Sequence, residues 1–228
     1  MKLIFIHGSG GAGESFQYQT DYFKDSEAVN LPGHPEGVPC TTIDEYADWL
    51  RGYVKDRGHD DVVLAGHSLG GGIALAYALK YPNDLKGLIL LGSGVRLRVH
   101  PMFLESLEKA CGEPGIFEEF AGASYERIDP ELTDILTKRV QENGPAVMLN
   151  DMRACDNFNI MGREHEITVP TLAICGADDE MTPPKYSRFV EKNIAGARAV
   201  IIEGGTHFVF AEKPKAVNEA IEEFLEGI

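Results

Sequence analysis

The chain has 228 residues, of which 43% are hydrophobic and 25% charged, and its formal net charge at pH 7 is −15. This apolar content excludes a mainly disordered chain, and the length suits one globular domain with a large core. The 36 acidic residues outnumber the 21 basic ones and would repel phosphate backbones and anionic lipids, so we expect no nucleic-acid and no membrane partner.

Short apolar runs without polar alternation indicate strands that are buried on both faces, and helical patterns separate these runs. In chain order, we expect strands at 3–6, 27–31, 62–65, 88–91, 172–174 and 199–202, and helices at 43–55, 68–81, 183–193 and 213–225. Strands that alternate with helices predict an α/β fold, with a mostly parallel sheet covered by helices on both faces. Pro32 follows the second run and limits that strand to an edge.

Residues 94–167 interrupt this alternation and contain no predicted strand. Asp129 and Pro130 have the pattern of a helix start, whereas Pro114 and the Gly144-Pro145 pair should break helices. We therefore expect a core made of residues 1–93 and 168–228, with residues 94–167 inserted as a helical cap.

A G-x-S-x-G pattern, Gly66-His67-Ser68-Leu69-Gly70, lies between a predicted strand and a predicted helix. A nucleophilic serine must stand on a sharp, strained turn, and glycines two residues to either side remove the Cβ atoms that would clash there. The alternative is a glycine-rich turn with an exposed serine and no catalytic role. The neighbouring strand and helix favour the nucleophile.

A second glycine-rich segment, Gly8–Gly13, directly follows the first strand. Acyl transfer needs two N–H donors for its oxyanion, and we assign them to the backbone amides of Ser9 and Leu69. The segment also fits the G-x-G-x-x-G pattern of dinucleotide-binding loops, but Glu14 would then face the pyrophosphate. We expect no cofactor.

Two further polar groups follow predicted strands. Asp178, Asp179 and Glu180 follow the strand at 172–174, and His207 follows the strand at 199–202. A solvated turn would explain at least two of the three acids. Serine, acid and histidine, each just after a strand and in this chain order, are nevertheless typical of a catalytic triad.

The chain resembles the carboxylesterases of the α/β-hydrolase fold that carry a helical cap. The strings that carry this resemblance are Ile6-His7-Gly8, Leu31-Pro32-Gly33-His34, Gly66-His67-Ser68-Leu69-Gly70-Gly71, Val169-Pro170-Thr171-Leu172, Gly176-x-x-Asp179-x-x-x-Pro183 and Gly205-Thr206-His207. The resemblance implies that Ser68 is the nucleophile, His207 the base and Asp179 the orienting acid. Members of this family commonly begin with a strand hairpin that this chain lacks, so we expect about six strands and an exposed edge at 27–31 that favours a homodimer.

These features predict a serine hydrolase that cleaves small to medium acyl esters. Met148, Met152 and Met161 lie on one stretch of the cap and suggest a small-molecule substrate with an apolar group. Packing between the cap helices is the more common explanation of such residues, and it is compatible with that role. C–C bond hydrolysis or perhydrolysis on the same triad, and a non-catalytic receptor, are the alternatives. Arg96 and Arg98 either bind a carboxylate or are simply solvated.

The remaining polar residues predict no further chemistry. The four cysteines, Cys40, Cys111, Cys155 and Cys175, are far apart in the sequence, which predicts reduced thiols, a cytoplasmic location and no metal site. The first apolar run is too short for a signal peptide or a membrane span. His7 and His67 are expected to pack and to form hydrogen bonds.

Overall fold

The computed structural model describes residues 1–113, 115–118, 125 and 127–228. Its sheet has six strands in the order β2-β1-β3-β4-β5-β6, and every neighbouring pair is parallel. The strands are β1 (Lys2–Ile6), β2 (Ser26–Val29), β3 (Val62–His67), β4 (Leu85–Leu91), β5 (Thr171–Gly176) and β6 (Arg198–Ile202). The prediction of a mostly parallel sheet of about six strands is confirmed.

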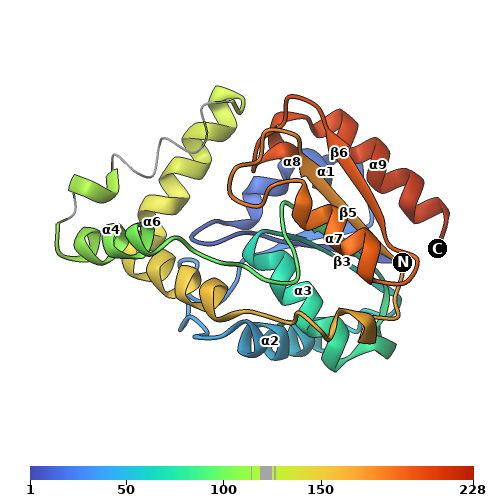
Figure 1. Ribbon diagram of the computed structural model, residues 1–228. Helices are drawn as coiled ribbons and strands as arrows, with labels where there is room; N and C mark the ends of the chain where they lie inside the picture. Colours follow the sequence, from blue (N-terminus) through green and yellow to red (C-terminus); the bar gives the residue numbers. More distant parts are fainter. Residues whose placement is uncertain (114, 119–124, 126) are drawn as a thin grey trace.

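Side chains that alternate along each strand form two apolar clusters, one on each face of the sheet. Ile4 and Leu64 belong to one cluster, whereas Phe5 and Val63 belong to the other. The first face is covered by α2 (Ile43–Asp56), α3 (Leu69–Lys80) and α7 (Lys185–Asn193), and the second by α1 (Gln17–Tyr22), α8 (Val209–Glu212) and α9 (Pro214–Glu226) (Figure 1). Helices cover both faces, as the apolar runs predicted.

The segment between β4 and β5 is built from helices in the part that the structure describes. It holds α4 (Pro101–Gly112), α6 (Pro130–Asn157) and the 3₁₀ turn η3 (Glu164–Glu166). The Asp129 carboxylate accepts hydrogen bonds from backbone amides in the first turn of α6, as expected of the residue that caps the start of a helix. Gly144, at φ 78°, breaks the helical backbone inside α6 at the predicted position. Pro114, the other predicted break, lies outside the described residues.

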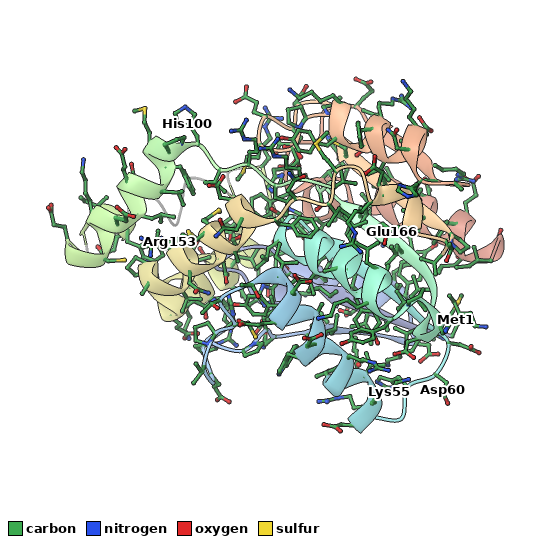
Figure 2. The ribbon with its side chains drawn as sticks, turned by 60° about the horizontal axis from the view of Figure 1, so that its bottom comes forward. Met1, Lys55, Asp60, His100, Arg153 and Glu166 are labelled. Carbon is green, nitrogen blue, oxygen red and sulfur yellow. The ribbon has the colours of Figure 1, made fainter. Side chains whose placement is uncertain are left out.

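The helices α4 and α6 pack against each other at the end of the molecule where the strands finish. His100, which precedes α4, and Arg153 on α6 lie opposite Met1 and Asp60, which precede β1 and β3 (Figure 2). The apolar side chains of α6 join both clusters, since Met148 belongs to the second and Ala154 to the first. This segment therefore shares its core with the sheet.

The predicted edge strand is β2, which covers Ser26–Val29 and forms one end of the sheet. It ends at Val29, and the Leu31 amide beyond it donates to the imidazole of His7. Pairing of two copies at this edge stays a prediction. Among the described residues, no helix combines the length and the apolar character that crossing a bilayer requires.

Candidate active site

The crevice that holds the predicted residues follows from the strand order. β1 connects to β2 over the face that α1 covers, whereas β3 connects to β4 through α3 on the opposite face. Because these adjacent strands send their connections to opposite faces, their carboxyl ends leave a crevice between them. The loop after β1 and the turn after β3 both border it.

Ser68 occupies the turn between β3 and α3 in a strained conformation, with φ 51° and ψ −112°. A Cβ on Gly66 would overlap the carbonyl oxygen of Gly70, and a Cβ on Gly70 would overlap that of Ile6. Only glycine fits at either position, which explains the G-x-S-x-G spacing. The turn is fixed by the amide of Ser68, which donates to the carbonyl of Leu91 at 3.0 Å.

His207 and Asp179 form a buried pair on the loops that follow β6 and β5. The Nδ1 of His207 lies 2.9 Å from Oδ2 of Asp179, and the two residues are 6% and 3% exposed. The other carboxylate oxygen, Oδ1, accepts the amides of Met181 and Thr182 at 2.9 and 2.8 Å. Asp178 points away and forms an exposed ion pair with Arg127, so the geometry selects Asp179 from the acidic run.

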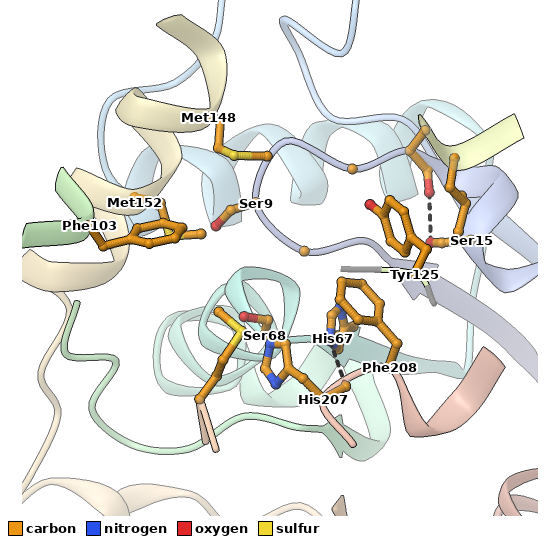
Figure 3. A pocket seen from close by; sticks show the side chains of 15 residues that line it. Ser9, Ser15, His67, Ser68, Phe103, Tyr125, Met148, Met152, His207 and Phe208 are labelled. Carbon is orange, nitrogen blue, oxygen red and sulfur yellow. Dashed lines mark hydrogen bonds between the residues drawn. The ribbon is translucent and has the colours of Figure 1, made fainter. Parts of the chain in front are cut away.

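The surroundings of Asp179 keep it ionised. Burial raises the pKa of this carboxyl, but the hydrogen bond and charge of His207 and the two donors of Thr182 outweigh burial and lower the pKa to about 2. An ionised Asp179 accepts the Nδ1 proton of His207 and leaves Nε2 as the nitrogen that accepts a proton. Ser68 and His207 project into the same pocket (Figure 3).

His67 and His7 are buried structural residues, as predicted. Burial and the nearby His207 hold the pKa of His67 well below its usual value, so its ring is neutral. The Nε2 of His67 lies 3.1 Å from the backbone oxygen of His207, and the two rings pack 4.6 Å apart. Burial likewise lowers the pKa of His7 to about 3, and His7 bonds to the carbonyl of Gly8. Both rings hold the backbone that surrounds the site.

The loop after β1 approaches the serine turn closely. A Cβ on Gly8 would lie 3.3 Å from Cβ of Ser68, and the amide of Gly11 donates to the carbonyl of Gly8 across a tight turn. Within the described residues, the Ser9 amide between them makes no backbone hydrogen bond. The Leu69 amide has no intrahelical acceptor because Leu69 is the first residue of α3.

A polar cluster that the sequence did not indicate holds this loop against α6. The carboxylate of Asp151, which is fully buried, accepts the amide of Gly10 at 2.9 Å, Nε2 of His34 at 2.8 Å and the hydroxyl of Tyr46 at 2.9 Å. Asn143, on the other side of the break in α6, donates to the carbonyl of Gly10 at 2.9 Å. Asp151 and Asn143 are 8 residues apart but lie more than 100 residues from Gly10, so no local motif could have shown this contact.

The pocket beside Ser68 is small and mostly apolar. It has a cavity volume of about 150 Å³ and is lined by Met148, Met152 and Phe103 on the side of α4 and α6 (Figure 3). A larger, more open cavity of about 720 Å³ also reaches Ser68 and His207. Met161, grouped with the other methionines in the sequence, does not line either cavity because it is exposed on the chain after α6.

The residues that surround these cavities are not arranged to hold a metal ion. No group of three or more histidine, cysteine, aspartate or glutamate side chains is suitably placed in the described part of the chain. Burial raises the pKa of Cys155, which contacts Ser9, to about 12, so the thiol is protonated and a poor ligand.

A parallel sheet with a strained serine turn, a buried histidine–aspartate pair and a glycine-rich loop at one crevice defines the α/β-hydrolase class. The model of the alpha/beta hydrolase family matches residues 3–220. The chain therefore belongs to the alpha/beta hydrolase family, which confirms the family that the sequence resembles.

Individual relatives cover nearly the whole chain. A proline iminopeptidase of Saccharolobus solfataricus is 28% identical over 100% of this chain and 85% of that protein. A pimeloyl-[acyl-carrier protein] methyl ester esterase of Neisseria meningitidis is 26% identical over 100% of this chain and 94% of that protein. Among solved structures, a thermophilic esterase is 32% identical, with a TM-score of 0.83 over 99% of this chain and 90% of that chain.

Proposed function

We propose that this protein is a serine carboxylesterase in which Ser68, His207 and Asp179 form the catalytic triad. The observation that carries the proposal is that Ser68, at φ 51°, and His207 line the same pocket, and that His207 is paired with the buried Asp179. A serine held in a strained turn, beside a histidine whose tautomer is set by a carboxylate, is the arrangement that nucleophilic catalysis requires.

In this mechanism Nε2 of His207 takes the proton of Ser68 as the hydroxyl attacks the ester carbonyl. The backbone amides of Ser9 and Leu69 stabilise the tetrahedral oxyanion, each contributing about 3–4 kcal/mol to transition-state stabilisation. His207 then protonates the leaving alcohol, and water hydrolyses the acyl-enzyme by the same steps in reverse. Asp179 stabilises the imidazolium, and no cofactor or metal enters the cycle.

The substrate class is inferred from the pocket lining. Met148, Met152 and Phe103 offer adaptable apolar contacts to a small or medium acyl or alcohol group. In this reading, residues 94–167 act as the cap that excludes water from the ester. Two of the relatives named above are esterases, which supports ester hydrolysis over peptide hydrolysis. A cytoplasmic location and dimer formation are further parts of the proposal.

Replacing Ser68 by alanine tests the nucleophile. We expect kcat for p-nitrophenyl esters to fall by about 10⁵-fold or more, because a triad without its nucleophile loses almost all of its rate enhancement. Ser106→Ala is the matched control, since Ser106 lies exposed on α4 and bonds only to the carbonyl of Met102. A folded Ser68→Ala protein, verified by circular dichroism, that keeps wild-type turnover would refute the assignment.

Two additional assays separate the alternatives. Labelling of the wild type, but not of Ser68→Ala, by a fluorophosphonate distinguishes an active nucleophile from a non-catalytic receptor. A vinylogous diketone assayed beside the ester series distinguishes C–C hydrolysis from ester hydrolysis, because the chemistry on this fold follows the pocket and not the triad. Faster cleavage of the diketone than of every ester would overturn the carboxylesterase proposal.

A further inference from the structure

The segment that leaves β4 directs two arginines to the same side of the molecule. The carbonyl of Val95 accepts the amide of Ile160 at 2.9 Å, and the amide of Leu97 donates to the carbonyl of Phe158 at 3.3 Å. Val95 and Leu97 are therefore buried, whereas Arg96 and Arg98 alternate with them and face outward. Residues two apart on an extended chain lie about 7 Å from each other, so the two guanidinium groups share one side.

The start of α7 forms the facing wall of a groove of about 350 Å³ that these arginines line. It contributes the ammonium of Lys185 and the half-buried rings of Tyr186 and Phe189. The Tyr186 ring packs on the backbone at Gly94, two residues before Arg96. A Cβ built on Gly94 would lie only 2.8 Å from Cδ1 of that ring. The groove therefore has an aromatic floor and three cationic groups at its rim.

Arg96 and Arg98 differ from most arginines of the chain in having no carboxylate partner among the described residues. Seven of the ten arginines form ion pairs: Arg51, Arg127, Arg139, Arg153, Arg163, Arg188 and Arg198. An eighth, Arg57, lies over the ring of Tyr53 at 3.6 Å. Among the described residues, Arg96, Arg98 and Lys185 form no ion pair, although the net charge is −15.

The groove is continuous with the space around the serine. Arg98 and Tyr186 line the groove and also line the cavity of about 720 Å³ that contains Ser68 and His207. Two carboxylates, Asp156 and Glu180, line that cavity as well. Oδ1 of Asp156 accepts the amide of Val99 at 3.0 Å, and neither carboxylate forms an ion pair with Arg98.

We propose that Arg96, Arg98 and Lys185 form an anion subsite for a carboxylate carried by the ester substrate, at the end remote from the scissile bond. The inference rests on the proposed esterase function and makes it more specific: the preferred substrates are esters with a second, ionised carboxyl group. A guanidinium binds a carboxylate with two parallel hydrogen bonds, and the aromatic floor packs the apolar chain between the carboxylate and the ester.

The test compares charged and neutral esters of equal chain length. The charged probes are monomethyl esters of linear dicarboxylic acids, and the neutral probes are methyl esters of the matching monocarboxylic acids, with methanol release measured for both. A second set, ω-acetoxy acids, carries the carboxylate on the alcohol side. The set that shows the preference identifies the side of the ester that reaches the groove. The Arg96→Gln, Arg98→Gln double variant is compared with Arg198→Gln, which removes a cation at the start of β6.

We expect the wild type to prefer the charged ester in one of the two sets. The double variant should raise KM for that ester roughly five- to tenfold, because it removes two exposed charged contacts whose contributions to binding add. KM for the neutral ester should change far less. Arg198→Gln should keep the wild-type preference. Equal kinetics for charged and neutral esters in both sets, or an equal loss for both esters in the double variant, would overturn the subsite.

A separate readout distinguishes this inference from the proposed function. If the protein cleaves no ester, isothermal titration with glutarate, a dicarboxylate that cannot react, measures the subsite alone. Binding that is lost in the double variant would keep the subsite while the esterase proposal fails. Absence of glutarate binding to the wild type would overturn the subsite as well.

Discussion

Replacing Asp151 by alanine removes the one acceptor that three buried donors share. These donors are the amide of Gly10, Nε2 of His34 and the hydroxyl of Tyr46, at 2.8–2.9 Å from the carboxylate oxygens. The side chain of Asp151 is fully buried, so water does not replace it without a change in packing. The variant should therefore lose stability at the contact between α6 and the loop after β1.

The size of the loss follows from these contacts. Removing one partner of a buried charged cluster typically costs about 3–5 kcal/mol of unfolding free energy, because the remaining donors lose their partner. For a chain of this length, 1 kcal/mol changes Tm by about 2–4 °C, so we expect Tm to fall by roughly 6–20 °C. Asp151→Asn keeps an oxygen acceptor and the shape, and should lose about 1–2 kcal/mol.

Urea unfolding followed by circular dichroism measures the change in stability, and kcat for a p-nitrophenyl ester measures its effect on the site. Asp134→Ala is the matched control, since Asp134 is exposed on the same helix and should change the unfolding free energy by less than about 0.5 kcal/mol. Because Asp151 holds the loop that carries the Ser9 amide, we expect kcat to fall more than KM rises in Asp151→Asn.

The result that refutes this reasoning is specific. The control sets the threshold at about 0.5 kcal/mol. If the unfolding free energy of Asp151→Ala lies within this threshold of the wild-type value, the cluster contributes no net stability. Unchanged kcat in Asp151→Asn would show that the position of the loop does not depend on the charge.

Two further predictions concern the site itself. The Asp179 carboxylate, with its pKa lowered to about 2 from 3.8, stabilises the folded state above pH 4 by about 2 kcal/mol, and this contribution is lost as the pH falls from 4 towards 2. Unfolding measured across that range should be less pH-dependent in Asp179→Asn, and an identical slope would contradict the assignment. Gly66→Ala should be inactive and destabilised by about 3 kcal/mol or more, because its Cβ overlaps the Gly70 carbonyl. Gly52→Ala, with open space around it on α2, should instead be stabilised by about 0.5–1 kcal/mol in thermal unfolding, and equal effects of the two changes would refute the steric argument.

The sequence determined the class of the fold and most of its elements. Apolar runs and helical periodicity located all six strands and the helices α2, α3, α7 and α9, because burial on a parallel sheet leaves a strong local signature. The spacing of Gly66 and Gly70 around Ser68 also predicted the sharp turn at the serine, since close backbone contact requires glycine at those positions. The break at Gly144 was equally local.

Elements with weak patterns were not predicted. The helices α1 and α8 span only Gln17–Tyr22 and Val209–Glu212, too few residues to show a helical period. Met161 was grouped with Met148 and Met152 by proximity in the sequence, but α6 ends at Asn157 and the chain then turns outward. Residues at helical spacing face the same cavity only as long as they lie on the same helix.

The resemblance named Asp179, but only the tertiary structure shows why this acid, and not its neighbour, meets His207 and what holds the loop after β1. Asp178 and Asp179 are adjacent in sequence, and the turn after β5 buries one against His207 while it exposes the other. Asp151 reaches His34 and Gly10 across 117 and 141 residues. Hydrogen bonds between distant segments depend on how the layers pack, and a single sequence carries no periodicity that reports such packing.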